Sequence, residues 1–389
     1  MENLVTHSNF VRTILSNKFD IAMIFFIAAL AIYYHFYISQ MVLPVWDGAI
    51  YLENAQNWLR NEPLDASYRP PLISWIIAGI WSITGEDWTV AKYIQPIFTL
   101  GAGVILYQTL KKYKGDFFAF GVTALTILNP YVFAYSTQIL TEGISLFFVV
   151  LSIYFLKSEN RYSWIFAGVA MALTFASRYP IFVVIIAFFI MEIIARRDVK
   201  KLKLFAYTMV GLLPVLLLII MAVYTKTGEF TVAIERDTEL SFLLSPFYIE
   251  KFIRIFGFVS LLLPIAFIFR RTYTDKYNYP FIAMFFIGFL FWSSISENQQ
   301  ERFMIQVTPA AYFLTILAIE SIWKRADVLS VSNLRDFARA ALNWTHLAAK
   351  RILFSPFRYY LCAFVLAVLS LIYLEHIISL EEQMLQSIF

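Results

Sequence analysis

The sequence has 389 residues, of which 60% are hydrophobic and only 15% are charged. Soluble domains contain about 45–50% hydrophobic and about 25% charged residues, so the composition excludes an ordinary soluble protein. The basic residues behind the net charge of +4 lie mostly at the ends of apolar segments, which argues against nucleic-acid binding. No polar stretch approaches the roughly 100–150 residues of a soluble domain, and we predict an all-α, multi-pass protein with one transmembrane domain, 1–389.

Eleven apolar segments are predicted to cross the bilayer, since a transmembrane helix needs about 20 mostly apolar residues. The first exceeds the about 7–15 residues of a signal-peptide core and lacks a cleavage site, so we expect it to be retained. Two nearly continuous pairs are divided by predicted turns at Asn129-Pro130 and at Ser177-Arg178-Tyr179-Pro180. The predicted spans are 19–38, 91–110, 117–135, 138–156, 162–177, 180–195, 203–224, 252–269, 279–295, 304–323 and 358–379.

The distribution of lysine and arginine predicts the orientation, because basic residues concentrate in cytoplasmic loops. With the N-terminus in the cytoplasm, most of the 31 basic residues fall in cytoplasmic loops such as 111–114, 196–203 and 324–358. We therefore expect a cell-membrane protein whose C-terminus lies outside. Over 332–352, apolar residues share one helical face, which predicts an amphipathic helix on the cytoplasmic surface or, alternatively, a solvated connector.

The first outer loop, 39–90, is long for a chain whose other outer loops are short. It contains five of the 9 tryptophans, and such residues are enriched at the headgroup level of a bilayer. We predict two short interfacial helices in it, 48–60 and 72–83, the second opened by Pro70-Pro71. On the first helix, one face is predicted to carry Ala49, Leu52, Ala55, Gln56 and Leu59.

Ionisable residues on the outer side are the candidates for chemistry. Asp47 lies where the first span gives way to the first loop helix, although helix starts favour Asp without any further role. Glu142 and Arg178 interrupt apolar runs, where an ionisable side chain costs about 2.5–3.5 kcal/mol and is a functional candidate by default. These two could instead pair structurally with each other, and Arg302 could be a snorkelling arginine at the end of a span.

Several short motifs in this order resemble one enzyme family. The first span is followed by Pro44-Val45-Trp46-Asp47-Gly48-Ala49-Ile50-Tyr51, and later by Tyr68-Arg69-Pro70-Pro71-Leu72. This order resembles the polyprenyl-phosphate-dependent glycosyltransferases of the GT-C fold, in particular the branch of protein O-mannosyltransferases and lipid A aminoarabinose transferases. Segments 137–145, 168–180 and 301–309 are also similar to that family, so the resemblance covers roughly residues 19–325. It departs at Gly48, where the family often has a second acid.

The resemblance implies a GT-C fold and transfer of a sugar, with inversion, from a polyprenyl-phosphate donor to a protein, lipid or glycan acceptor on the outer face. Such a reaction needs a carboxylate to accept the proton of the acceptor and positive charge for the departing phosphate. Glu142 could position the acceptor or help to hold a divalent cation, so a metal requirement stays open. The resemblance implies Asp47 as the catalytic base, Arg69, Arg178 and Arg302 as ligands of the donor phosphate, and Tyr51, Tyr68 and Glu142 as substrate contacts.

Two other functions fit a polytopic chain. A transporter or flippase of lipid-linked sugars would use charged residues at span ends as a translocation path, but no clear repeat between two halves is visible and eleven spans do not divide evenly. A non-catalytic membrane scaffold would leave the long aromatic outer loop without an explanation. For the enzyme, the expected partners are the lipid-linked donor, an acceptor and membrane lipids.

Overall fold

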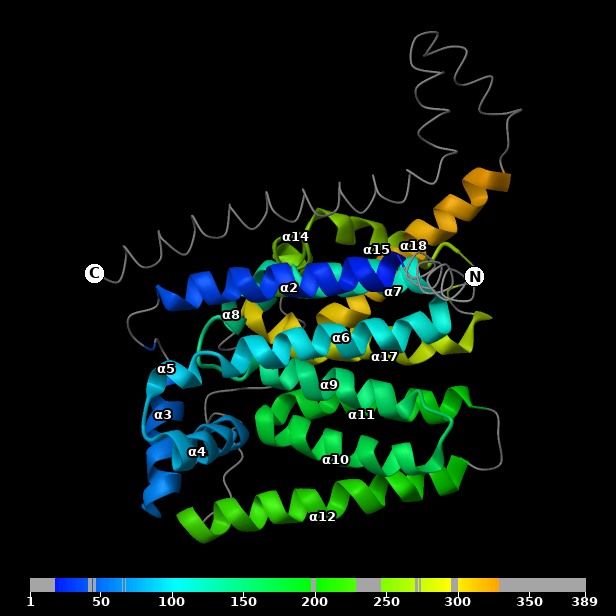
Figure 1. The fold of residues 1–389 in the computed structure, drawn as a ribbon. Coiled ribbons are helices and arrows are strands. Elements are labelled where there is room, and N and C mark those ends of the chain that lie inside the picture. The colour runs from blue at the N-terminus through cyan, green and yellow to red at the C-terminus, as the bar shows by residue number, and fades with distance from the viewer. Residues whose placement is uncertain are drawn as a thin grey trace, which may run out of the picture.

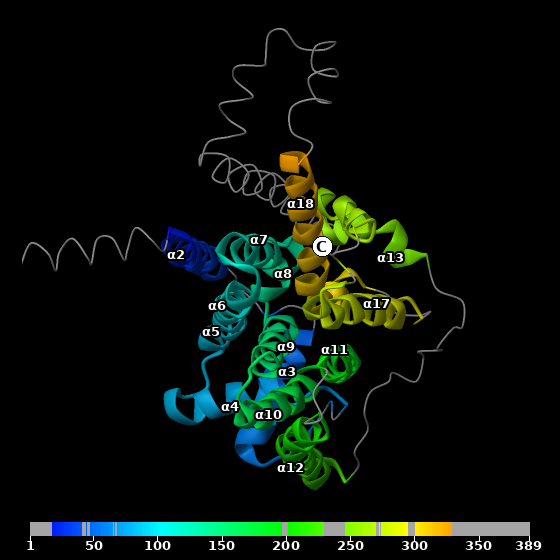
Figure 2. The ribbon, with the colours of Figure 1, turned by 90° about the vertical axis from the view of Figure 1, so that its right-hand side faces the viewer.

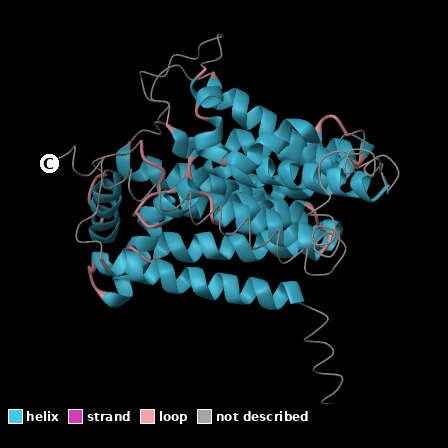
Figure 3. Cartoon of the chain, turned by 90° about the horizontal axis from the view of Figure 1, so that it is seen from above, coloured by secondary structure: helices cyan, strands magenta, loops and turns pink. Residues whose placement is uncertain are grey.

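The computed structural model describes residues 18–40, 44, 47–64, 66, 68–196, 201–228, 246–269, 272, 274–294 and 300–328. Within these ranges the chain consists of helices and turns, without a strand (Figure 3). The all-α fold expected from the composition is confirmed for this part of the chain. The predicted span 358–379 and the predicted amphipathic helix 332–352 lie outside the described residues.

Most of the long helices lie side by side along one axis, and Figure 2 shows several of them nearly end-on. α9 is central, because it contacts α6, α8, α10, α11 and the 3-10 helix η4. The helices of this bundle are α2 (Lys18–Ser39), α6 (Ile94–Lys114), α7 (Asp116–Ile127), α8 (Pro130–Ser136), α9 (Glu142–Leu156), α10 (Arg161–Ser177), α11 (Phe182–Ala195), α12 (Lys201–Thr227), α17 (Tyr279–Ser293), η4 (Glu301–Val307) and α18 (Thr308–Val328).

The chain is a multi-pass membrane protein. Among the described residues, four segments are long and apolar enough to cross a bilayer: Lys18–Ser39, Trp88–Lys114, Lys203–Thr227 and Glu301–Trp323. The bent pair α7–α8 would be a fifth, and shorter apolar helices such as α9 pack beside them. The count of eleven spans therefore stays a prediction.

Both predicted turns are present. Leu128 and Asn129 separate α7 from α8, whose axes differ by 56°. The Asn129 side chain accepts hydrogen bonds from the first backbone N–H groups of α8 and donates one to the Tyr312 hydroxyl at 2.9 Å, so the bend is anchored to α18. The predicted span 117–135 is accordingly two helices. At the second turn, α10 ends at Ser177 and a short 3-10 helix, η1 (Tyr179–Ile181), leads into α11.

The single span predicted over 252–269 is wrong, because the chain there forms several short helices. They are α13 (Phe247–Glu250), α14 (Phe252–Phe256), η2 (Phe258–Leu262) and α15 (Leu263–Ala266). Gly257 ends α14 with a φ of 74°, a left-handed conformation that glycine adopts readily. Pro264 occupies the first turn of α15, where a proline starts a helix well but cannot continue one from the preceding turn.

The two predicted loop helices are confirmed as α3 (Asp47–Arg60) and α4 (Leu72–Thr84), followed by the short α5 (Trp88–Ala91). All three lie at one end of the bundle, and α3 runs across its axis (Figure 1). The face of α3 that is buried overlaps only partly with the face noted in the sequence: Gly48, Tyr51 and Ala55 are buried, whereas Leu59 is exposed. The reason is that α3 packs against α4 and against the segment before α9, where Ile139 belongs to the same apolar cluster.

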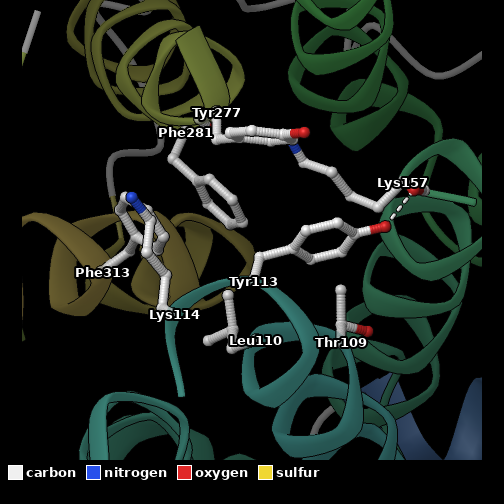
Figure 4. A pocket seen from close by; sticks show the side chains of 8 residues that line it. All are labelled: Thr109, Leu110, Tyr113, Lys114, Lys157, Tyr277, Phe281 and Phe313. Carbon is white, nitrogen blue, oxygen red and sulfur yellow. Dashed lines mark hydrogen bonds between the residues drawn. The ribbon is translucent and has the colours of Figure 1, made fainter. Parts of the chain in front are cut away.

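The opposite end of the bundle is closed by basic and aromatic side chains around a small pocket (Figure 4). Lys157, at the end of α9, forms a fully buried ion pair of 2.7 Å with Glu192 of α11. Lys114, at the end of α6, binds Asp275 at 2.6 Å. Since each of these lysines already has a carboxylate partner, this end of the bundle is tied together by matched charges.

The helices α10 and α12 approach each other closely through two glycines. A Cβ atom on Gly211 would lie 1.9 Å from the carbonyl oxygen of Ile165, and one on Gly168 would lie 2.1 Å from that of Thr208. Both contacts are with backbone atoms, which have no flexible end to move aside. The sequence therefore needs glycine at these two positions if α12 is to lie against α10.

We predict that Gly211→Ala lowers the free energy of unfolding by about 1–3 kcal/mol, the usual cost of overpacking, because α12 must move away from α10. Gly79→Ala is the matched control: Gly79 lies in helix α4 with open space around its missing side chain, and alanine favours a helix over glycine by up to about 1 kcal/mol. Thermal unfolding in detergent would measure both. Equal stability of Gly211→Ala and the wild type would contradict the close contact.

Candidate functional site

Five charged side chains from distant parts of the sequence meet at the end of the bundle that carries α3 and α4. Asp47 is the first residue of α3, and Arg69 lies in the turn before α4. Glu142 is the first residue of α9, Arg178 follows the last residue of α10, and Arg302 lies in η4. The local breaks in the helices bring these residues together, because each of them stands at or next to a helix end.

Asp47 forms ion pairs with two arginines. Its carboxylate receives two hydrogen bonds from the Arg69 guanidinium, of 2.8 and 3.2 Å. A nitrogen of Arg302 lies 3.5 Å from one of the same carboxylate oxygens. Forked contacts of this kind between arginine and a carboxylate are strong and directional. The Asp47 side chain stays 19% exposed, so it is accessible from solvent as well as tied to its partners.

Glu142 is buried, with an exposed fraction of 1%. One of its carboxylate oxygens lies 2.5 Å from a nitrogen of Arg178 and 3.7 Å from Nε of Arg302. The other carboxylate oxygen accepts a hydrogen bond from the Thr141 backbone N–H at 3.0 Å. The alternative considered from the sequence, that Glu142 and Arg178 pair with each other, is confirmed as a contact, and such a contact is compatible with a role in binding.

Arg302 joins the two halves of the network, since it contacts both carboxylates. The network thus contains three guanidinium groups and two carboxylates, which leaves one excess positive charge. The Nε atoms of Arg69 and Arg302 are buried without a hydrogen-bond partner, although buried polar groups in proteins are nearly always hydrogen-bonded. Arginine suits phosphate and carboxylate groups because its donors form a planar fork. The site is therefore suited to bind an anion.

Aromatic residues surround the charged network. The Arg69 guanidinium lies 5.1 Å from the Tyr68 ring centre, and that of Arg178 lies 4.9 Å from the Phe303 ring centre. Tyr51 is buried, and its burial is the main reason why its pKa is raised to about 12; the neighbouring Arg69 opposes this shift. The Tyr51 hydroxyl therefore stays protonated, and able to donate a hydrogen bond, at neutral pH.

All seven residues predicted from the sequence lie in or against this network, although Tyr68 is 36% exposed and contacts only its edge. Arg302 is not a snorkelling arginine at a span end, because it is largely buried and contacts both acids. Two residues of the site were not predicted from the sequence. Phe303 stacks on Trp292, and the Tyr179 hydroxyl donates a 3.5 Å hydrogen bond to the Arg69 carbonyl oxygen. Their positions next to Arg302 and Arg178 are the signal that could have identified them.

A metal site is not evident in the described part of the chain. No group of three or more His, Cys, Asp and Glu side chains lies close enough there to hold an ion. Both carboxylates of the network are instead occupied by arginines.

Comparisons with known proteins agree with this arrangement. Residues 68–224 match the family described as dolichyl-phosphate-mannose-protein mannosyltransferase, and this segment includes Arg69, Glu142 and Arg178. A lipid A galacturonosyltransferase, RgtD, from Rhizobium johnstonii is 26% identical over 144 residues, which are 35% of this chain and 30% of the relative. The chain thus spans less than a third of that curated relative's length.

Solved structures extend the similarity beyond that segment. ArnT from Cupriavidus metallidurans matches 84% of this chain and 66% of its own in the apo state, with a TM-score of 0.62 and 16% identity. The same protein bound to undecaprenyl phosphate matches 90% and 70%, with a TM-score of 0.64 and 15% identity. The oligosaccharyltransferase AglB from Archaeoglobus fulgidus matches 85% and 51%, with a TM-score of 0.52 and 12% identity.

At these low identities the solved structures show a shared fold. The family match over residues 68–224 and the 144-residue alignment with the curated relative are to enzymes that are named for glycosyl transfer. The resemblance of this chain to the GT-C-fold, polyprenyl-phosphate-dependent glycosyltransferases is confirmed.

Proposed function

We propose that this protein, as one transmembrane domain, transfers a sugar from a polyprenyl-phosphate donor to an acceptor. The observation that carries the proposal is the network of three arginines and two acids, with its excess positive charge and two buried guanidinium nitrogens that make no hydrogen bond. Two similar structures support the lipid part of the donor, because ArnT is bound to undecaprenyl phosphate and AglB to a dolichol-phosphate. A donor of this kind stays in the bilayer, which fits a site at one end of a membrane bundle.

In the proposed reaction, an acceptor hydroxyl attacks the anomeric carbon of the donor sugar with inversion. The bond from that carbon to the phosphate oxygen breaks, and the electron pair leaves with the polyprenyl phosphate. Asp47 accepts the proton of the hydroxyl as general base, while Arg69, Arg178 and Arg302 stabilise the negative charge of the leaving phosphate. Glu142 orients Arg178 and Arg302, and Tyr51 and Tyr68 contact the substrates.

Without donor, Arg69 and Arg302 both contact Asp47. A phosphate monoester carries about 1.5 to 2 negative charges near neutral pH, so it competes with a carboxylate for a shared guanidinium. We propose that donor binding draws Arg302 towards the phosphate, because its contacts of 3.5 and 3.7 Å are longer than the 2.8 Å contact of Arg69. The Asp47 oxygen that Arg302 leaves then keeps only its 3.2 Å hydrogen bond from Arg69 and can accept the proton of the acceptor.

The decisive assay incubates the purified protein with a panel of radiolabelled polyprenyl-phosphate sugars and candidate acceptors. An enzyme releases the sugar from the lipid and transfers it to an acceptor. A flippase or a scaffold leaves the lipid-linked sugar intact. The proposal would be contradicted if every lipid-linked sugar in the panel remained intact.

Asp47→Asn is predicted to lower the rate of sugar transfer by about 10²–10⁴, the range for loss of a general base, because the amide cannot accept the proton. Glu53→Gln is the matched control, since Glu53 is an exposed carboxylate on the same helix α3, and it should retain wild-type transfer. Initial rates at saturating donor would measure both variants. Wild-type transfer by Asp47→Asn would remove Asp47 from the mechanism.

The buried pair of Glu142 and Arg178 separates stability from donor binding. Removing one partner takes away the shortest ion pair of a buried charge, so Glu142→Gln or Arg178→Gln alone should lower the free energy of unfolding by up to about 3–5 kcal/mol. The double variant should regain part of this stability, but it should not regain affinity for undecaprenyl phosphate, because Arg178 is missing. Thermal unfolding and a lipid-binding assay on the three variants would test this. Recovery of both quantities in the double variant would indicate a purely structural pair.

We further propose that the charged network faces the outside of the cell. The ends of α6 and α9 carry basic residues of the kind expected in the cytoplasm, among them Lys111, Lys112 and Lys157. These helix ends lie at the end of the bundle opposite to α3 and α4 (Figure 1). This arrangement supports an N-terminus in the cytoplasm. The proposed C-terminus outside rests on the predicted last span, 358–379, which lies outside the described residues.

An impermeant thiol reagent applied to intact cells should label Glu62→Cys and not Lys112→Cys, after the native Cys362 has been replaced. Both positions are exposed in the structure and lie at opposite ends of the bundle. Permeabilised cells provide the control, because both variants should react there. Labelling of Lys112→Cys alone in intact cells would reverse the orientation.

A further inference from the structure

The first turn of α9 carries Glu142, yet its own N-cap residue does not cap it. The Thr141 side chain makes no capping hydrogen bond; its hydroxyl instead accepts a 3.4 Å contact from Arg178. The first four N–H groups of a helix lack partners within the helix and need them elsewhere when buried. Here the residues around Glu142 are fully buried, so another part of the chain must satisfy this turn.

That partner is Gln95, a fully buried residue in the first turn of α6. Its carboxamide oxygen accepts a 3.0 Å hydrogen bond from the Ile144 N–H, the third residue of α9. Its carboxamide nitrogen donates to the carbonyl oxygen of Leu140, two residues before Glu142. One side chain of α6 therefore bonds to the backbone on both sides of Glu142, and it fixes the point at which α9 begins.

Gly143 makes this contact possible. A Cβ atom on Gly143 would lie 2.8 Å from the carboxamide oxygen of Gln95 and 2.4 Å from the hydroxyl oxygen of Thr99. Because α6 approaches so closely, only glycine fits at the position directly after Glu142. This requirement shows that Gln95 lies tightly against the backbone of the turn.

A second buried glutamine holds the same turn from the other side. Gln306 lies in η4, four residues beyond Arg302. Its carboxamide nitrogen donates a 2.5 Å hydrogen bond to the Ser145 hydroxyl and a 3.5 Å one to the carbonyl oxygen of Glu142. The segment that carries Arg302 is thus bonded directly to the turn that carries Glu142.

We propose that Gln95 and Gln306 are positioning residues that set the placement of Glu142, and through it the placement of Arg178 and Arg302. Neither glutamine is a ligand of the donor in this proposal; both act through the Glu142 carboxylate. Charged groups that act on a substrate work best when their own neighbours lock them in place by hydrogen bonds. The inference rests on the proposed function, because its effect is a change in the binding of a lipid phosphate.

The test compares Gln95→Met and Gln306→Met with Gln108→Met. Methionine keeps the length of the side chain and removes its hydrogen bonds, and Gln108 is an exposed glutamine on the same helix α6 as Gln95. Undecaprenyl phosphate in detergent is the probe, and its affinity is measured below the melting temperature of each variant. We expect about tenfold weaker binding for the first two variants, the order of effect of one or two lost buried hydrogen bonds, and wild-type binding for Gln108→Met.

The same substitutions in a Glu142→Gln background separate positioning from a general loss of stability. If the glutamines act through the Glu142 carboxylate, they should change the affinity little in that background, while the melting temperature still falls. The same fold loss in both backgrounds, or wild-type affinity in both single variants, would overturn the inference. If Gln95→Met does not fold, Gln306→Met decides alone, because its oxygen already lacks a partner and only one donor group is lost.

The outcomes also separate this inference from the proposed function. A wild-type protein that does not bind undecaprenyl phosphate would contradict the function and the positioning role together. A wild-type protein that binds the lipid, with glutamine variants that bind equally well, would contradict the positioning role alone.

Discussion

The structure depends on one shared interaction, the contact of Arg302 with both Asp47 and Glu142. Without it, the loop before α3 and the central helix α9 would each hold a separate ion pair, Asp47 with Arg69 and Glu142 with Arg178. A lone buried charge is costly at membrane depth, so all five side chains must be present and in place together. Each carboxylate is then paired with guanidinium groups, and the one remaining positive charge can attract an anion.

The helix breaks are what make such a site possible in a membrane bundle. A straight span keeps its ionisable residues one above another along its own axis, whereas a helix end can present a residue to several neighbours. The bend between α7 and α8 and the 3-10 turn between α10 and α11 both place helix ends next to the site. Glu142 also gains from its place at the first residue of α9, because the N-terminal end of a helix favours a negative charge.

The two ends of the bundle contrast in their charge balance. At the end with Lys114 and Lys157, each lysine is bound to a carboxylate, and the aromatic rings around them close the space between the helices. At the end with α3 and α4, guanidinium donors are left without partners. The bundle thus has one end held by matched charges and one end with an excess of positive charge, which fits the proposed binding of a lipid-linked phosphate.

Residue chemistry alone determined the membrane class, the two loop helices and four of the five charged candidates, because apolar run length, proline position, helix starts and charges in apolar surroundings are local properties of the chain. The fifth, Arg69, was named through the family resemblance. Local patterns did not determine the breaks within 252–269, the buried face of α3 or the role of Gln95, since each depends on which segment packs opposite. Gln95 has no sequence signal of its own; only the fold places its carboxamide beside α9. Likewise, the sequence could name Arg302 and both acids, but only the tertiary structure decided that one guanidinium contacts two carboxylates that are 95 residues apart in the chain, because a contact over that separation requires the whole bundle to be folded.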